Sequence, residues 1–113
     1  MPEKVPDDFQ SGWIETLDKR TVVAQAMRSR FTQFTDDLGG VSRLSYQQKS
    51  LVERCLWLEY WLVQQENALA TGGDFDVGKW VQAANSLQGI LSKLGLVRVP
   101  KDINDLAEFL AQQ

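Results

Sequence analysis

The chain of 113 residues contains no histidine and a single cysteine. Histidine is the commonest general base and metal ligand, so its absence excludes the usual serine and cysteine triads and most zinc sites. The chain also lacks a GxxxxGK[S/T] loop, a GxGxxG loop and a calcium-loop pattern. Cys55 lies among leucines, and we expect it to be a small buried apolar residue. We therefore expect no catalytic residue, no metal and no cofactor, in a protein that is not an enzyme.

Long hydrophobic runs are also missing. No apolar stretch approaches 18 residues, and the opening residues, MPEKVPDD, do not resemble a signal peptide. These features predict a cytoplasmic protein with no membrane partner. The length suits a single domain. We predict a flexible acidic tail over residues 1–12, held by Phe9 and Trp13, and a single helical domain over residues 13–113.

The net charge of −3 is distributed unevenly. Residues 1–18 hold one basic and five acidic side chains, residues 19–54 seven basic and three acidic, and residues 55–113 four basic and seven acidic. A basic segment between acidic ones is compatible with a local phosphate contact, although solvated surface charge is the alternative. The candidate DNA-binding residues are Lys19, Arg20, Arg28, Arg43 and Lys49.

One long helix dominates the pattern. Ser45 and Gln48 form a capping-box signature, and Gly72-Gly73 ends the segment about 26 residues later. Near its centre this helix is apolar on most sides, so other elements or copies of the chain must cover it on most sides.

Three further helices follow from capping residues and apolar spacing. Thr21 caps a helix that ends at Gly39-Gly40, Asp76 caps a helix over residues 77–94, and Asp102 caps a short one. No segment alternates as a strand would. The predicted fold is all-α: an antiparallel long-helix hairpin with an N-terminal helix and a short C-terminal helix.

A cluster of aromatic residues lies in the predicted hairpin. Its neighbours Glu59, Glu66 and Asp76 would repel phosphate, so a core or subunit interface is favoured over a stacking platform for single-stranded nucleic acid. We predict a homo-oligomer. The candidate interface residues are Trp57, Leu58, Trp61, Leu62 and Trp80.

Seven short motifs resemble small proteins encoded by tailed phages and prophages. They are W-I-x-x-L-D-x-R-T (13–21), D-L-G-G (37–40), L-S-Y-Q-Q (44–48), W-L-E-x-W-L-x-x-Q-E (57–66), F-D-V-G-K-W (75–80), N-S-L-x-G (85–89) and L-G-L-x-R (94–98). Within that set the chain resembles the phage terminase small subunit. The resemblance implies a non-catalytic DNA-packaging component in the host cytoplasm that forms rings through a helical hairpin. Its implied partners are double-stranded DNA and the terminase large subunit.

Small terminases usually carry a helix-turn-helix domain before the hairpin and a strand-forming tail after it. Here a single clear helix precedes the hairpin, and the chain ends in LAEFLAQQ. The alternative function is an acidic protein-binding module, such as an inhibitor of a host defence or a virion adaptor, that binds no nucleic acid. The acidic ends of the chain would suit a basic protein partner.

Overall fold

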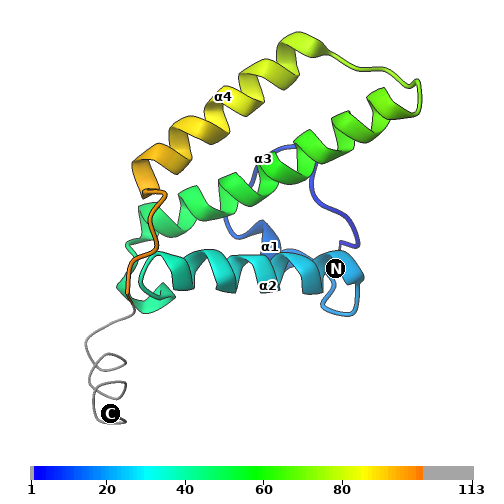
Figure 1. The fold of residues 1–113 in the computed structure, drawn as a ribbon. Helices are drawn as coiled ribbons and strands as arrows, with labels where there is room; N and C mark the ends of the chain where they lie inside the picture. The colour runs from blue at the N-terminus through cyan, green and yellow to red at the C-terminus, as the bar shows by residue number, and fades with distance from the viewer. Residues whose placement is uncertain (1, 101–113) are drawn as a thin grey trace, which may run out of the picture.

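The long helix expected from the capping box forms the central element of the fold (Figure 1). The computed structural model describes residues 2–100. In that range the elements are α1 (Trp13–Thr16), α2 (Val22–Asp37), the 3-10 turn η1 (Val41–Arg43), α3 (Tyr46–Ala70) and α4 (Val77–Leu94). The all-α fold and the antiparallel α3–α4 hairpin are confirmed. The short helix predicted after Asp102 lies outside the described residues.

Both ends of α3 follow from local chemistry. The Ser45 hydroxyl accepts a hydrogen bond from the Gln48 amide at 3.1 Å, and the Gln48 side chain accepts one from the Ser45 amide at 2.8 Å. This reciprocal pair satisfies two amides that the first turn leaves without helical partners. At the other end Gly72 takes a φ of +78°, which reverses the chain toward α4.

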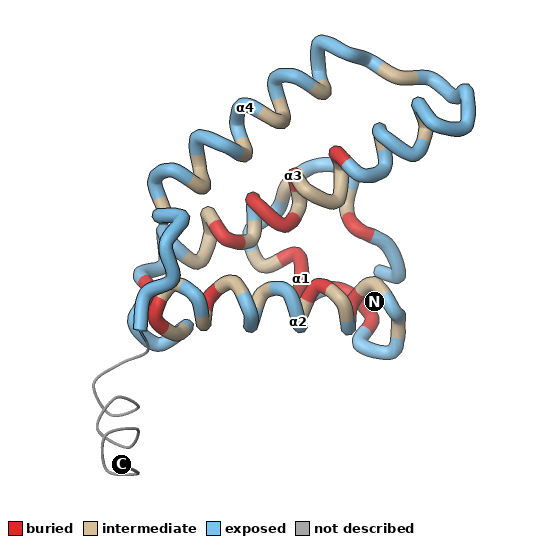
Figure 2. The backbone as a smooth tube through the Cα atoms, viewed as in Figure 1, coloured by how far each residue is buried: buried red, intermediate tan, exposed pale blue. Residues whose placement is uncertain are grey.

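The core lies on the N-terminal half of α3, between that helix, α1 and α2 (Figure 2). Trp13 is fully buried, and its indole N–H donates to the Glu53 carbonyl of α3 at 3.1 Å. Thr35 is buried as well, because its hydroxyl donates to the carbonyls of Phe31 and Thr32 within α2. The buried cluster comprises Val5, Trp13, Ile14, Leu17, Ala24, Met27, Val52 and Leu56.

The N-terminal segment lies along α3. The sequence predicts a flexible tail over residues 1–12 held by Phe9 and Trp13, and residues 2–12 make several contacts in the structure. Val5 is buried, the Trp57 indole donates to the Pro6 carbonyl at 2.9 Å, and the Phe9 ring meets Trp57 edge-on. The Arg54 guanidinium lies over the Phe9 ring, 4.0 Å from the ring centroid. The segment therefore covers a face of α3 that no helix covers.

Beyond Leu62, α3 is packed mainly by α4, and α4 contains no buried residue (Figure 2). Asp76 caps α4 through the Lys79 amide at 3.1 Å, as the sequence predicts. Trp80 bridges the two helices by donating to the Glu66 carboxylate at 3.3 Å. Within residues 2–100 the outer hairpin therefore consists of a pair of helices without a third layer.

The capping box gives a direct test of this fold. Ser45→Ala removes the side chain that accepts from Gln48, and we expect it to lower the free energy of unfolding by about 1 kcal/mol. Urea unfolding measures the change. The control Ser42→Ala alters an exposed serine of η1 and should leave stability nearly unchanged. Equal stability of the Ser45→Ala and wild-type proteins would contradict the capping assignment.

Candidate functional site

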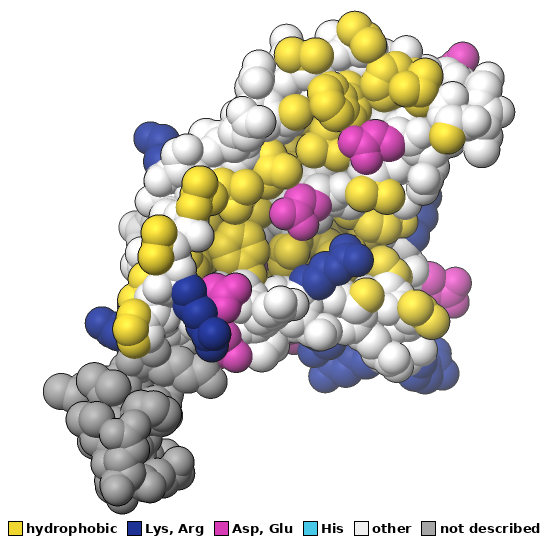
Figure 3. Space-filling view, in the orientation of Figure 1, with side chains coloured by type: hydrophobic (Ala, Val, Ile, Leu, Met, Phe, Trp, Pro, Cys, Tyr) yellow, Lys and Arg dark blue, Asp and Glu magenta, His cyan; other side chains and the backbone are white. Residues whose placement is uncertain are grey.

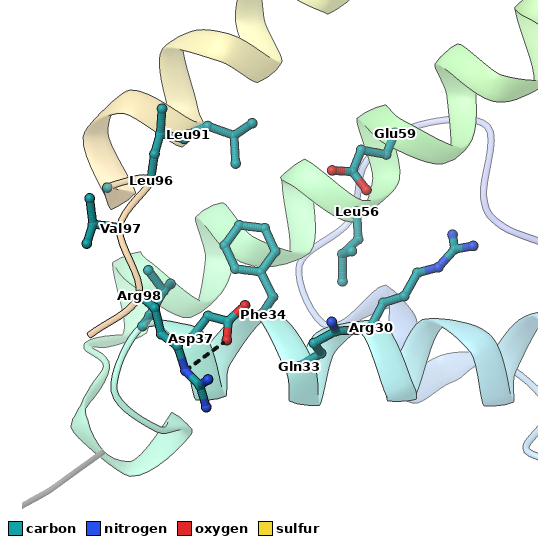
Figure 4. A pocket seen from close by; sticks show the side chains of 12 residues that line it. Arg30, Gln33, Phe34, Asp37, Leu56, Glu59, Leu91, Leu96, Val97 and Arg98 are labelled. Carbon is teal, nitrogen blue, oxygen red and sulfur yellow. Dashed lines mark ion pairs between the residues drawn. The ribbon is translucent and has the colours of Figure 1, made fainter. Parts of the chain in front are cut away.

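A groove of about 460 Å³ opens between α2 and α4, with α3 as its floor (Figure 4). Each of the three helices contributes apolar surface, from Phe34 of α2, Leu56 of α3 and Leu91 of α4. The groove exists because α2 and α4 both pack on α3 and hardly touch each other. A band of apolar side chains follows this side of the molecule toward the hairpin tip (Figure 3).

The segment after α4 closes one end of the groove. Arg98 pairs with Asp37 of α2 at 3.5 Å, and the Val99 amide donates to the Asp37 carbonyl at 2.7 Å. Gly39 permits this crossing: its φ is +108°, and a Cβ there would lie 3.4 Å from both Val99 and Pro100. These contacts hold residues 95–100 against the end of α2.

Two opposite charges border the groove farther along α2. Arg30 and Glu59 extend from α2 and α3 toward the space between those helices (Figure 4). Burial raises the pKa of the half-buried Glu59 carboxyl, and the Arg30 charge partly opposes that effect. No ion pair between these two side chains forms in the described structure. The groove thus combines an apolar floor with a desolvated acid and a nearby cation.

The five candidate DNA-binding residues form two groups rather than one patch. Lys19 and Arg20 precede α2, whereas Arg43 and Lys49 lie at the corner between η1 and α3. The 16 residues of α2 put about 24 Å between these groups. Arg28 lies along α2 between the two groups.

Two of these five residues are already paired with acids. The Arg20 guanidinium donates twice to Asp18, at 3.1 and 2.9 Å, and this pairing lowers the pKa of Asp18 to about 2. Arg28 lies 3.5 Å from the Glu15 carboxylate. Within residues 2–100 no ion pair involves Lys19, Arg43 or Lys49. Those three residues carry the uncommitted positive charge of the predicted set.

The five candidate interface residues also separate. Leu58 and Leu62 are buried within the protomer. Trp57 is half-buried beneath the N-terminal segment through its bond to Pro6. Only Trp61 and Trp80 remain half-exposed on the outer hairpin, where they are accessible to a partner.

Sequence reasoning missed the side chains most available to a partner. Leu69, Val77 and Val81 fit core faces by their spacing, yet they are 57, 64 and 45% exposed, and Val63 is 48% exposed. We call these four residues the outer hairpin set. One signal was visible in the sequence: residues 61–94 carry only five charged side chains, and interface centres are depleted in charge.

Neither a metal site nor a reactive cysteine is visible in the part of the chain that the structure describes. No group of three or more potential ligands gathers there. Cys55 is buried, as expected, and its burial raises the pKa of the thiol to about 12, with a further contribution from Glu59. A thiol in that state is a poor nucleophile at neutral pH. Among the described helices, none has the length and apolar character to cross a bilayer.

Comparisons with known proteins gave no relatives: no family model, no curated protein and no solved structure matches this chain.

The raised pKa of Glu59 predicts a pH-dependent effect on stability. The Glu59 carboxyl has a higher pKa in the folded protein than in the unfolded chain. Its charge therefore destabilises the fold at pH values above the ordinary carboxyl pKa. Glu59→Gln should therefore unfold at higher urea than wild type at pH 7. That advantage should vanish on acidification below the unfolded-state pKa, where both states are protonated. A variant less stable than wild type at pH 7 would show that Glu59 makes a favourable ionised contact.

Proposed function

We propose that this chain is a non-catalytic assembly protein that associates with copies of itself through the outer hairpin, and that it serves recognition of viral DNA for packaging. The observation that carries the proposal is the uncovered apolar surface of the hairpin. The four residues of the outer hairpin set are each 45% exposed or more, and α4 has no buried residue. While that surface stays in water, the protein lacks about 25 cal/mol of stabilisation for each Å² of apolar surface that a partner could cover.

A second copy suits this surface better than a highly charged partner would. The 18 residues of α4 contain only two charged side chains, Lys79 and Lys93. Copies can therefore approach one another along α4 without strong repulsion. The same scarcity of charge gives a strongly charged partner few groups to pair with. Trp61 and Trp80 lie in this region, and tryptophan is enriched among the residues that dominate binding energy.

The DNA part of the proposal rests on the resemblance and on the uncommitted cations. Arg43 and Lys49 are six positions apart at the corner between η1 and α3. An assembly of copies would repeat this corner, so that weak contacts with a continuous duplex add together.

The second candidate function is the acidic protein-binding module. The pairing of Arg20 with Asp18 and of Arg28 with Glu15 favours it, because these arginines have less positive charge left for phosphate. The two functions differ in their response to DNA, and the hairpin surface serves either one.

Self-association can be tested through thermal stability. If copies associate, the melting temperature should rise with protein concentration, since association stabilises the folded state by mass action. Val81→Asp places a charge in the outer hairpin set and should abolish that dependence. The matched control Gln25→Asp adds the same charge on an exposed position of α2 and should retain it. A wild-type melting temperature independent of concentration would refute self-association.

DNA binding is tested by fluorescence anisotropy with a labelled duplex at several salt concentrations. We expect affinity to fall steeply with salt, because each neutralised phosphate releases counterions. Arg43→Ala with Lys49→Ala should reduce the salt slope by about two units. The control pair Lys79→Ala with Lys93→Ala removes the same charge from α4 and should change the slope little. An affinity for DNA that does not change with salt would contradict DNA binding, as would equal effects of the two pairs of substitutions. Either result would favour the protein-binding function.

A further inference from the structure

The groove between α2 and α4 is open on the side away from α3, and its apolar lining lacks a cover in the described part of the chain (Figure 3). We propose that it is the docking site for residues 103–110 of the same chain. This inference does not depend on the proposed function, because it concerns the groove rather than the outer hairpin set.

The described part of the chain ends close to the groove. Residues 95–98 line one end of the groove, and Pro100 lies against Gly39 at the end of α2. Thirteen residues, 101–113, follow that point. Two residues, 101 and 102, therefore separate the last described residue from the segment 103–110, and Pro100 with Asp102 supplies residue types that favour a turn before a helix.

The sequence of residues 103–110 has an amphipathic pattern. Ile103, Leu106 and Leu110 recur at spacings of three and four residues, which places them along one stripe of a helix, with Phe109 at its margin. Such a stripe complements a groove floored by Phe34, Leu56 and Leu91.

The segment and the groove also match in length. Residues 103–110 would span about 12 Å as a helix, and the α2 wall of the groove, from Arg30 to Leu38, also spans about 12 Å. The apolar stripe therefore matches the groove without overhanging it.

The charges are compatible with this placement. Asp105 and Glu108 project from the side of the predicted helix opposite the stripe, so docking leaves both carboxylates in water. Residues 101–113 carry one basic and three acidic side chains, and Arg30 at the groove wall supplies a cation with no ion pair among residues 2–100.

The tether distinguishes this occupant from a separate molecule. A segment joined through a short link has an effective concentration near the millimolar range, so even weak affinity fills the groove. A neighbouring copy must instead compete at its own concentration. The same segment supplied by a neighbour is therefore the main rival.

Hydrogen–deuterium exchange of the full chain, followed by mass spectrometry, tests the proposal. Leu106→Asp places a charge in the apolar stripe, and we expect amide exchange in residues 87–95 and 30–38 to accelerate at least tenfold. The matched control Asn104→Asp adds the same charge outside the stripe and should exchange as wild type does. Peptides covering Trp13 and Val52 should be unchanged in both variants, which separates loss of docking from general unfolding.

Each result either supports or overturns docking of the segment in the groove of its own chain. Faster exchange confined to the groove walls, in Leu106→Asp alone and equal at low and high protein concentration, supports docking within one chain. The same response appearing only at high concentration would assign the segment to a neighbouring copy and overturn the proposal. Wild-type exchange in Leu106→Asp, or equal acceleration in both variants, would show that the stripe does not occupy the groove.

Discussion

The fold depends on how the other elements cover the apolar surface of α3. This helix of 25 residues is apolar around most of its circumference at its centre, and a chain of this size has few elements to place around it. The N-terminal segment, α1 with α2, and α4 each take one side of the helix. Because α2 has only 16 residues, its cover ends before α3 does. Among the described elements, the C-terminal part of α3 then retains α4 alone, and the exposed outer hairpin follows from this shortfall.

Two indole hydrogen bonds fix how the inner half is covered. The Trp13 indole donates to Glu53 and the Trp57 indole to Pro6, so both tryptophans bury their rings while their N–H groups remain satisfied. The first bond sets α1 against α3, and the second holds the N-terminal segment on the neighbouring surface. With those sides occupied, the uncovered apolar surface of α3 lies between α2 and α4. We propose two different uses of the surface that remains: assembly through the outer hairpin and docking of the C-terminal segment in the groove.

Local signals made the helices predictable from sequence. Thr21, Ser45 and Asp76 cap α2, α3 and α4, and each side chain accepts the backbone hydrogen bond that its residue type implies. The buried state of Cys55 followed from its apolar neighbours in the same way. In these cases the decisive interaction spans only a few residues.

Interactions between distant segments were not predictable by the same reasoning. The N-terminal segment is held by a hydrogen bond between Pro6 and Trp57, 51 positions apart, and no local pattern encodes that pairing. Thr35 has a polar side chain, yet it is buried in the core because a backbone carbonyl of its own helix accepts a hydrogen bond from its hydroxyl. The apolar spacing of Val77 and Val81 indicates a buried face of α4. The spacing cannot show that no further element of the described chain covers that face. The groove arises from the divergence of α2 and α4, which is a tertiary property.

The central claim is that copies of the chain complete the cover of the outer hairpin. The solution mass of the full-length protein, measured by light scattering over a range of concentrations, tests it most directly. The account predicts an assembly whose mass is a multiple of the 12.8 kDa chain. A mass of 12.8 kDa at every concentration would contradict it, because the exposed hairpin would then be stable in water without a second copy.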